Sequence, residues 1–182
     1  MDHADHVALI QGAVEGRRGT WADLGSGEGA FTLALADVLG PGGTILSVDR
    51  DSGALRAQER EMRRRFPQAV VEYRRADFTT PGSIGVDPAS LDGFVMANSL
   101  HYVADQPAVL GHLVALLKPG GRFVLVEYDT ETGNRWVPHP VPFAAWERLS
   151  AAAGLRRTHR VHQVPSRFLG HIYSAASDVA ER

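Results

Sequence analysis

The feature that most constrains the fold is a glycine-rich turn between an apolar segment and a helical one. Residues 20–24 have the composition of a buried strand, residues 25–29 read Gly-Ser-Gly-Glu-Gly, and residues 30–39 have helical character. Glycine tolerates positive φ and has no side chain, so the backbone of such a turn can approach a ligand closely. The segment predicts a strand, turn and helix that form part of a ligand-binding α/β fold.

The remaining sequence continues the alternation of strands and helices. Further strands are predicted at 44–49, 70–74, 91–97 and 122–127, and helices at 7–14, 54–66, 109–117 and 142–153. Two last strands, at 157–164 and 168–175, are separated only by residues 165–167, and so short a connection requires them to be antiparallel. The pattern predicts a largely parallel sheet with helices on both faces and a ligand at the carboxyl ends of its strands.

Two aspartates lie at predicted strand ends beside the glycine turn. Asp23 comes two residues before Gly25, where an acid disfavours a phosphate and favours an ammonium group. Asp49 ends the next strand, where it can accept hydrogen bonds from both hydroxyls of a ribose. The turn also fits the dinucleotide pattern, as Gly25-x-Gly27-x-x-Ala30, which leaves a nicotinamide-binding oxidoreductase as an alternative.

Five ordered motifs give the chain a more specific resemblance over nearly its whole length. They are Asp23–Gly29, Asp49, Ala76–Phe78, Asn98–His101 and Leu116–Gly121. In these motifs the chain resembles small, single-domain class I S-adenosylmethionine (SAM)-dependent methyltransferases. The resemblance implies a Rossmann-like α/β fold with a seven-stranded sheet of order 3-2-1-4-5-7-6, strand 7 antiparallel and helices on both faces.

The resemblance also implies SAM as cofactor, S-adenosylhomocysteine as product, and a set of cofactor-binding residues. The turn at Gly25 would pass the methionine part of SAM, and Asp49 would bind the ribose. Asp77 would meet the adenine amine with Phe78 flanking the ring, and the backbone at Asn98 would receive the ammonium. The complete expected set is Asp23, Gly25, Ser26, Gly27, Asp49, Arg50, Ala76, Asp77, Phe78, Asn98 and Ser99.

Candidate catalytic residues follow from the chemistry of the acceptor. Methyl transfer needs alignment of cofactor and acceptor more than a strong catalyst, but oxygen and carbon acceptors usually must lose a proton. His101 and Glu127 are the candidate catalytic residues, with His139 and Tyr102 as further possibilities. The alternative for His101 is a packing role near the cofactor, and for Glu127 a backbone cap or a pair with an arginine.

The loop at 129–140 is predicted to cover the acceptor, since loops beyond strand ends carry specificity. Its Trp136 offers an apolar plane and its Arg135 a fork for an anion. The alternative is a surface loop whose tryptophan packs on the following helix.

Composition narrows the cofactors and partners. The 182 residues fit one domain, with a short leader helix in residues 1–19. Nineteen basic and 21 acidic residues provide no cationic field for nucleic acid or membrane. The absence of cysteine excludes disulfides, a thiolate nucleophile and cysteine-containing metal sites. No metal site is expected, because the odd spacing of His159 and His162 would place them on opposite faces of a strand.

The sequence therefore predicts a SAM-dependent methyltransferase that acts on a small-molecule acceptor, because no appended recognition domain is visible. We expect a cytoplasmic monomer or homodimer without nucleic acid or membrane partners, since neither a targeting segment nor an apolar span is present. Besides the oxidoreductase, a SAM-binding protein that lacks catalytic activity and acts through a partner remains an alternative.

Overall fold

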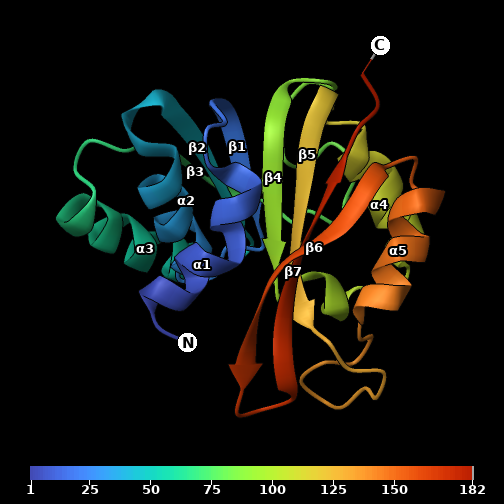
Figure 1. Ribbon diagram of the computed structural model, residues 1–182. Coiled ribbons are helices and arrows are strands. Elements are labelled where there is room, and N and C mark those ends of the chain that lie inside the picture. Colours follow the sequence, from blue (N-terminus) through green and yellow to red (C-terminus); the bar gives the residue numbers. More distant parts are fainter. Residues whose placement is uncertain (182) are drawn as a thin grey trace.

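The chain folds into a seven-stranded sheet of order β3-β2-β1-β4-β5-β7-β6 (Figure 1). The computed structural model describes residues 1–181. The strands are β1 (Gly19–Leu24), β2 (Gly43–Asp49), β3 (Val70–Arg75), β4 (Leu91–Ala97), β5 (Leu117–Tyr128), β6 (Arg156–Ser166) and β7 (Gly170–Asp178). Strands β1 to β5 pair in parallel, whereas β7 is antiparallel to both β5 and β6. The predicted fold class and strand order are confirmed.

The helices cover both faces of the sheet and create a buried cluster on each. They are α1 (His3–Val14), α2 (Ala30–Leu39), α3 (Ser52–Arg65), α4 (Gln106–Val114) and α5 (Phe143–Ala152), with short 3₁₀ helices η1 (Gly40–Gly42) and η2 (Leu100–Tyr102). On one face Phe123 lies between Phe94 and Trp146, with ring centroids 4.4 and 4.7 Å apart. On the other face α1 and α2 pack around Trp21. Within residues 1–181 no helix is long and apolar enough to cross a membrane.

The first helix is longer than the sequence predicts. It begins at His3 rather than at residue 7, because Asp2 and Asp5 form a reciprocal capping box. Its residues Leu9 and Ile10 are fully buried, and the helix packs against α2 and β6. The segment expected to be a short leader is therefore part of the core.

The junction between α4 and β5 also differs from the prediction. Asp105 caps α4, the helix ends at Val114 rather than at residue 117, and β5 begins at Leu117 rather than at residue 122. Leu117 pairs with Leu91 while Arg122 pairs with Gly93, so the intervening residues bulge from the ladder. The family motif Leu116–Gly121 thus lies largely within this irregular start of β5.

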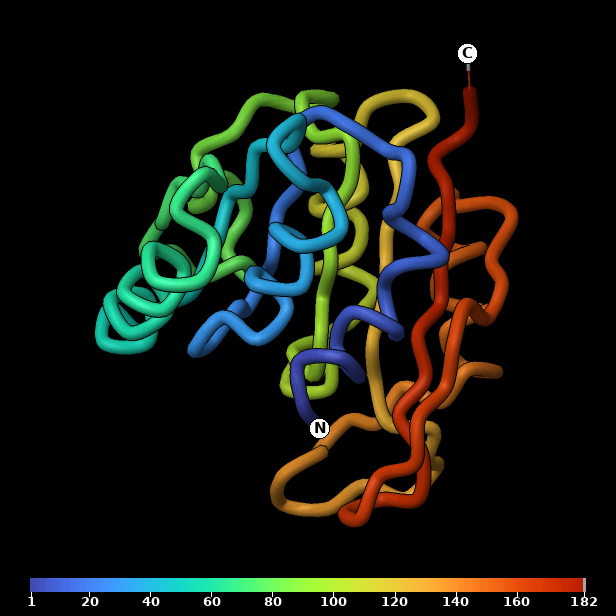
Figure 2. The backbone as a smooth tube through the Cα atoms, turned by 60° about the vertical axis from the view of Figure 1, so that its left-hand side comes forward, coloured from blue at the N-terminus to red at the C-terminus, as the bar shows by residue number. Residues whose placement is uncertain are grey.

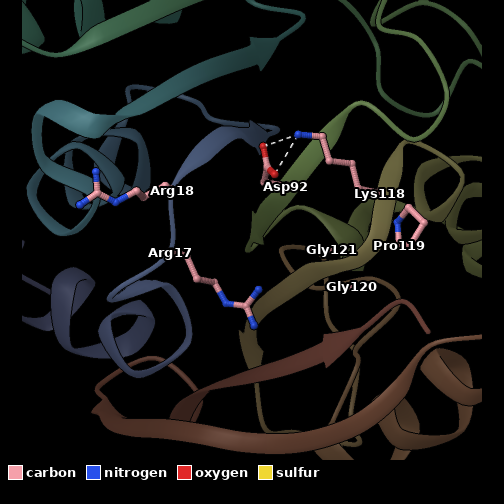
Figure 3. Close-up of a pocket in the computed structure, with 7 residues that line it drawn as sticks. All are labelled: Arg17, Arg18, Asp92, Lys118, Pro119, Gly120 and Gly121. Carbon is pink, nitrogen blue, oxygen red and sulfur yellow. Dashed lines mark hydrogen bonds and ion pairs between the residues drawn. The ribbon is translucent and has the colours of Figure 1, made fainter. Parts of the chain in front are cut away.

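A network of polar contacts fixes the bulge at the amino-terminal end of the sheet. Lys118 Nζ lies 2.8 and 2.9 Å from the two carboxylate oxygens of Asp92, and Asp92 also accepts from the backbone N–H of Thr20 at 2.7 Å. Beside this pair is a hollow of about 160 Å³, into which Arg17 points (Figure 3). The hollow contains none of the predicted cofactor-binding residues, which lie at the opposite end of the strands.

The final hairpin contains an irregularity that the sequence does not reveal. A register shift between Arg160 and His162 places His159 opposite Ala176 and His162 opposite Ser174. Because those partners are two residues apart on β7, both histidines lie on the same face, contrary to the expectation from odd spacing. The hairpin turn lies beside the loop at 129–142, at the carboxyl end of the parallel strands, in both views (Figures 1 and 2).

Candidate functional site

The glycine turn is held between β2 and the loop that follows β4. The backbone N–H groups of Gly25 and Ser26 both donate to the Val48 carbonyl, at 2.9 and 3.0 Å. Gly25 has φ +77°, and a Cβ there would lie 2.7 Å from the Cβ of Ser99. Both the backbone conformation and the close approach require glycine. The turn thus has a fixed position at the carboxyl ends of β1, β2 and β4.

Asp49 lies next to an open face of the turn. One of its carboxylate oxygens accepts from Gly27 N–H at 2.8 Å, and the other from Asp51 N–H at 2.8 Å. A Cβ added to Gly27 would meet no atom within 4 Å, so the space above the turn is free at this point. A carboxylate can accept about four hydrogen bonds, which leaves capacity on Asp49 for hydroxyl donors.

A buried polar network supports the turn from below, and sequence reasoning did not find it. Ser47 Oγ donates to Gln58 Oε1 at 2.9 Å, and Gln58 Nε2 donates to Ser26 Oγ and to the Gly27 carbonyl, both at 2.9 Å. The side chain of Ser26 is therefore turned inward. The available signal was Gln58 itself, a polar residue at helical spacing between the buried Leu55 and Met62.

Asp23 lies under the same turn and is only 1% exposed. Its Oδ2 accepts from Thr32 Oγ1 at 2.7 Å. Burial raises the pKa of Asp23 to about 7, and the charge of Asp49 adds to this effect. The Asp23 carboxyl therefore titrates near neutral pH in the folded protein, and it belongs to the layer beneath the open face of the turn.

The segment after β3 is shaped by its own side chains. Asp77 Oδ1 accepts from the backbone N–H and the hydroxyl of Thr79, at 2.9 and 2.7 Å, and these bonds lower the pKa of Asp77. Ala76 N–H donates to the Asp49 carbonyl at 3.1 Å. Phe78 packs beside the turn, since its ring would lie 3.1 Å from a Cβ at Gly25. These three predicted residues thus lie together with the glycine turn.

Two other residues, Arg50 and His112, lie beside this segment. Arg50 is exposed, and its carbonyl accepts from Arg75 Nε at 3.2 Å. His112 of α4 lies with its Nε2 2.8 Å from the Phe78 carbonyl, a contact that the sequence did not predict. Arg50 is the most exposed residue of the predicted cofactor-binding set, whereas His112 holds the backbone at Phe78 in place.

The loop after β4 presents a buried polar atom without a protein partner. Asn98 has φ +51°, its N–H donates to the Val126 carbonyl at 2.8 Å, and its Oδ1 is buried without a hydrogen bond from residues 1–181. Ser99 Oγ donates to the Leu24 carbonyl at 2.9 Å, which ties the loop to β1. A non-glycine residue at positive φ with an unsatisfied buried acceptor is typical of a ligand site.

His101 and Glu127 form a buried pair next to this loop. Glu127 Oε2 lies 2.6 Å from His101 Nδ1, and Oε1 accepts from the backbone N–H of His101 at 3.2 Å. The His101 side chain is 2% exposed, that of Glu127 is fully buried, and within the described part of the chain His101 Nε2 has no hydrogen-bond partner. With the carboxylate as acceptor, the neutral imidazole carries its proton on Nδ1 and its lone pair on Nε2.

The other candidate residues, Tyr102 and His139, contact His101 but form no hydrogen bond with the paired side chains of His101 and Glu127. Tyr102 is exposed, with its ring centroid 4.3 Å from that of His101. His139 is exposed, and its backbone N–H donates to the His101 carbonyl at 3.0 Å, which holds the loop at 129–140 against η2. In that loop the Arg135 guanidinium lies 4.7 Å from the ring centroid of Trp136, and Trp136 itself is 56% exposed.

Comparison with known proteins shows the family. Residues 18–159 match the model of a methyltransferase domain. The chain belongs to this methyltransferase family. The match covers every strand from β1 to β5 and all the residues of the site described above. The expected resemblance is therefore confirmed, and the fold is that of SAM-dependent methyltransferases.

Individual relatives share this domain at modest identity. The highly reducing polyketide synthase ACRTS2 of Alternaria alternata is 30% identical over 145 residues, 76% of this chain and 6% of that protein. Nocamycin O-methyltransferase of Saccharothrix syringae is 28% identical over 164 residues, 87% of this chain and 55% of that protein. The chain thus spans about half the length of nocamycin O-methyltransferase and a small part of the polyketide synthase.

A solved structure supports the same fold. The carbon methyltransferase CurJ superposes with a TM-score of 0.74 at 22% identity, over 93% of this chain and 50% of that one. At this identity the likeness concerns the fold. The family match favours a methyltransferase over the nicotinamide alternative, which rested on the glycine pattern alone.

Proposed function

We propose that this chain transfers the methyl group of SAM to a small-molecule acceptor that must lose a proton, with His101 as the base. The observation that carries the proposal is the buried pair of His101 and Glu127, whose free Nε2 faces no protein donor among residues 1–181. Glu127 is a positioning residue, because it contacts His101 and fixes both its orientation and its tautomer.

The polar groups around the glycine turn fit SAM. Asp49 has free lone pairs beside the open face at Gly27, which suits the two ribose hydroxyls. The unsatisfied Oδ1 of Asn98 is a suitable acceptor for the methionine ammonium. The Asp77 carboxyl, whose pKa is lowered, and the neighbouring Phe78 ring suit the adenine amine and ring. When bound, SAM supplies an electrophilic methyl group on a sulfonium.

The residues of the chain then have one chemical task, which is to remove a proton. Nε2 of His101 would accept the proton of the acceptor as the new bond to the methyl carbon forms and the carbon–sulfur bond breaks. The electron pair of the broken bond stays on sulfur, and the imidazolium that results is paired with the Glu127 carboxylate. An acceptor with an acidic hydroxyl or an acidic C–H needs this base, whereas a thioether or a tertiary amine does not.

The test compares cofactor binding with turnover. We expect His101→Ala to lower kcat by about 10²- to 10⁴-fold while the dissociation constant for SAM changes little. Turnover is measured as S-adenosylhomocysteine released with a panel of phenols, enols and 1,3-dicarbonyl compounds. Glu127→Gln should lower kcat less and shift its pH profile, because the amide no longer stabilises the imidazolium.

The matched control is His159→Ala, which removes an exposed histidine from β6. It should leave both SAM binding and turnover unchanged. SAM binding without turnover for any acceptor would favour the non-catalytic alternative, and full activity of His101→Ala would overturn the role of His101.

A further inference from the structure

Exposed aromatic side chains gather around the proposed base. Five large hydrophobic side chains are exposed in the described part of the chain, and they are Met1, Val70, Tyr102, Trp136 and Phe168. Three of these belong to the segments at the carboxyl end of the sheet, namely η2, the loop at 129–142 and the β6–β7 turn (Figures 1 and 2). Large exposed apolar groups that cluster at one place mark a binding surface more often than scattered ones do.

The rings next to His101 form a continuous aromatic wall, made of Tyr102, Tyr128 and Phe168. The His101 ring centroid lies 4.3 Å from that of Tyr102 and 6.2 Å from that of Tyr128. Phe168, from the hairpin turn, meets Tyr128 edge-on at 5.7 Å. Tyr102 and Phe168 are 61% and 51% exposed, whereas Tyr128 is partly buried. His101 therefore lies between the rings of Tyr102 and Tyr128, and the two outer rings of the wall, Tyr102 and Phe168, are open to solvent.

The depth of His101 limits what can reach it. Its side chain is 2% exposed and has the rings of Tyr102 and Tyr128 as neighbours, so only a narrow part of an acceptor can come within hydrogen-bond distance of Nε2. A flat molecule can do this by stacking on the aromatic wall, because offset-stacked and edge-to-face contacts between rings are favourable.

The wall is uncharged near the base. Burial raises the pKa of Tyr128, and the neighbouring Glu127 and Tyr102 raise it further, so this phenol stays neutral. Arg160, on strand β6 of the hairpin, is paired with Asp129 at 2.9 Å and lies over the ring of Phe143. The surroundings favour an apolar ring over a charged group.

We infer that the methyl acceptor is a planar, conjugated molecule whose ring packs on the aromatic wall while its acidic hydroxyl or C–H meets His101 Nε2. This inference rests on the proposed function and specifies its substrate class. The proton moves from the acceptor to Nε2, the acceptor's electron pair forms the bond to the methyl carbon, and the sulfonium keeps the electron pair of the bond that breaks.

The experiment compares two 1,3-diketones that differ only in a ring. Benzoylacetone and acetylacetone share the acidic carbon and have similar acidity, but only benzoylacetone carries an aromatic ring. Binding of each is measured calorimetrically with the full chain saturated with S-adenosylhomocysteine. We expect benzoylacetone to bind about tenfold more tightly or better. Phe168→Ala and Tyr102→Ala should each remove most of this preference while the affinity for S-adenosylhomocysteine is unchanged.

Val70→Ala is the matched control, because Val70 is 57% exposed but lies on the edge strand β3. It should leave both diketones unaffected. The inference would be overturned by equal affinities for the two diketones. It would also be overturned if Val70→Ala lost as much of the preference for benzoylacetone as Phe168→Ala and Tyr102→Ala do. If His101-dependent methylation of acetylacetone matches that of benzoylacetone, the proposed function stands and the aromatic wall is not its acceptor site. Failure to bind S-adenosylhomocysteine would instead overturn the proposed function.

Discussion

The buried carboxyl of Asp23 makes the stability of the fold depend on pH in a way that Asp23→Asn should remove. The side chain has a hydroxyl partner in Thr32 but no cation within its recorded contacts in residues 1–181. Burial therefore raises its pKa in the folded state, and the native protein binds this proton more tightly than the unfolded chain does. Stability that is present near pH 4 should be lost as the pH rises towards 7.

The size of the effect follows from the shift itself. The pKa of Asp23 rises from 3.8 to about 7, and one unit corresponds to about 1.4 kcal/mol, so the full loss is about 4 kcal/mol. Between pH 5 and pH 7 the loss should be about 2 to 3 kcal/mol, with only about 0.4 kcal/mol more lost at higher pH. Asn has the same shape and no proton to lose, so its free energy of unfolding lacks this component.

The assay is urea denaturation at several pH values from 5 to 8, followed by circular dichroism. The free energy of unfolding of Asp23→Asn minus that of the wild type should rise by about 2 to 3 kcal/mol over this range. Asp87→Asn, at an exposed aspartate, should give a constant difference. A difference for Asp23→Asn that stays constant within about 0.5 kcal/mol would refute the idea that burial controls this group.

Three other substitutions probe the layers around the turn. Asp49→Ala removes the acceptor for the backbone N–H groups of Gly27 and Asp51 and the proposed ribose contact. Calorimetry should therefore show SAM binding weaker by about 1 to 3 kcal/mol, and an unchanged affinity would mean that Asp49 does not belong to the site. Gln58→Ala removes one partner each from buried Ser26 and Ser47 and the side-chain donor to the Gly27 carbonyl, so thermal or urea denaturation should show a loss of about 1 to 3 kcal/mol. A neutral result would mean that the network is dispensable. Lys118→Ala breaks a half-exposed pair at the far end of the sheet, so stability should fall by at most about 1 kcal/mol and SAM affinity should stay constant. A clear loss of affinity in that variant would connect the two ends of the sheet.

The sequence predicts the framework of this protein because the framework depends on local patterns. The alternation of apolar and helical segments places the elements, and the three-residue connection, predicted at 165–167 and found at 167–169, requires an antiparallel pair. Element boundaries are less well predicted. The Asp2 capping box lengthens α1, and the pairing of Leu117 with Leu91 ends α4 early. Both boundaries depend on a contact with a second residue that composition does not identify.

For the candidate site, too, the sequence predicts some features and not others. Asp49, His101 and Glu127 could be selected from the sequence, because polar residues at the carboxyl ends of parallel strands collect at one edge of the sheet. Asp77 and Asn98 were implied by the family resemblance. Their contacts could not be selected. His101 and Glu127 are 26 residues apart, and their 2.6 Å contact exists because β4 and β5 are neighbours with matched register.

What the sequence alone determines is therefore the order of the elements, the family motifs and the polar residues that reach the functional edge. Only the tertiary structure decides that Gln58 supports the glycine turn, that Asp23 is buried beneath it, and that Phe168 comes close to Tyr128 beside His101. The physical reason is that these properties depend on burial and on rings or dipoles from distant segments meeting within a few ångströms. A linear pattern specifies which side chains exist, whereas packing specifies which of them meet.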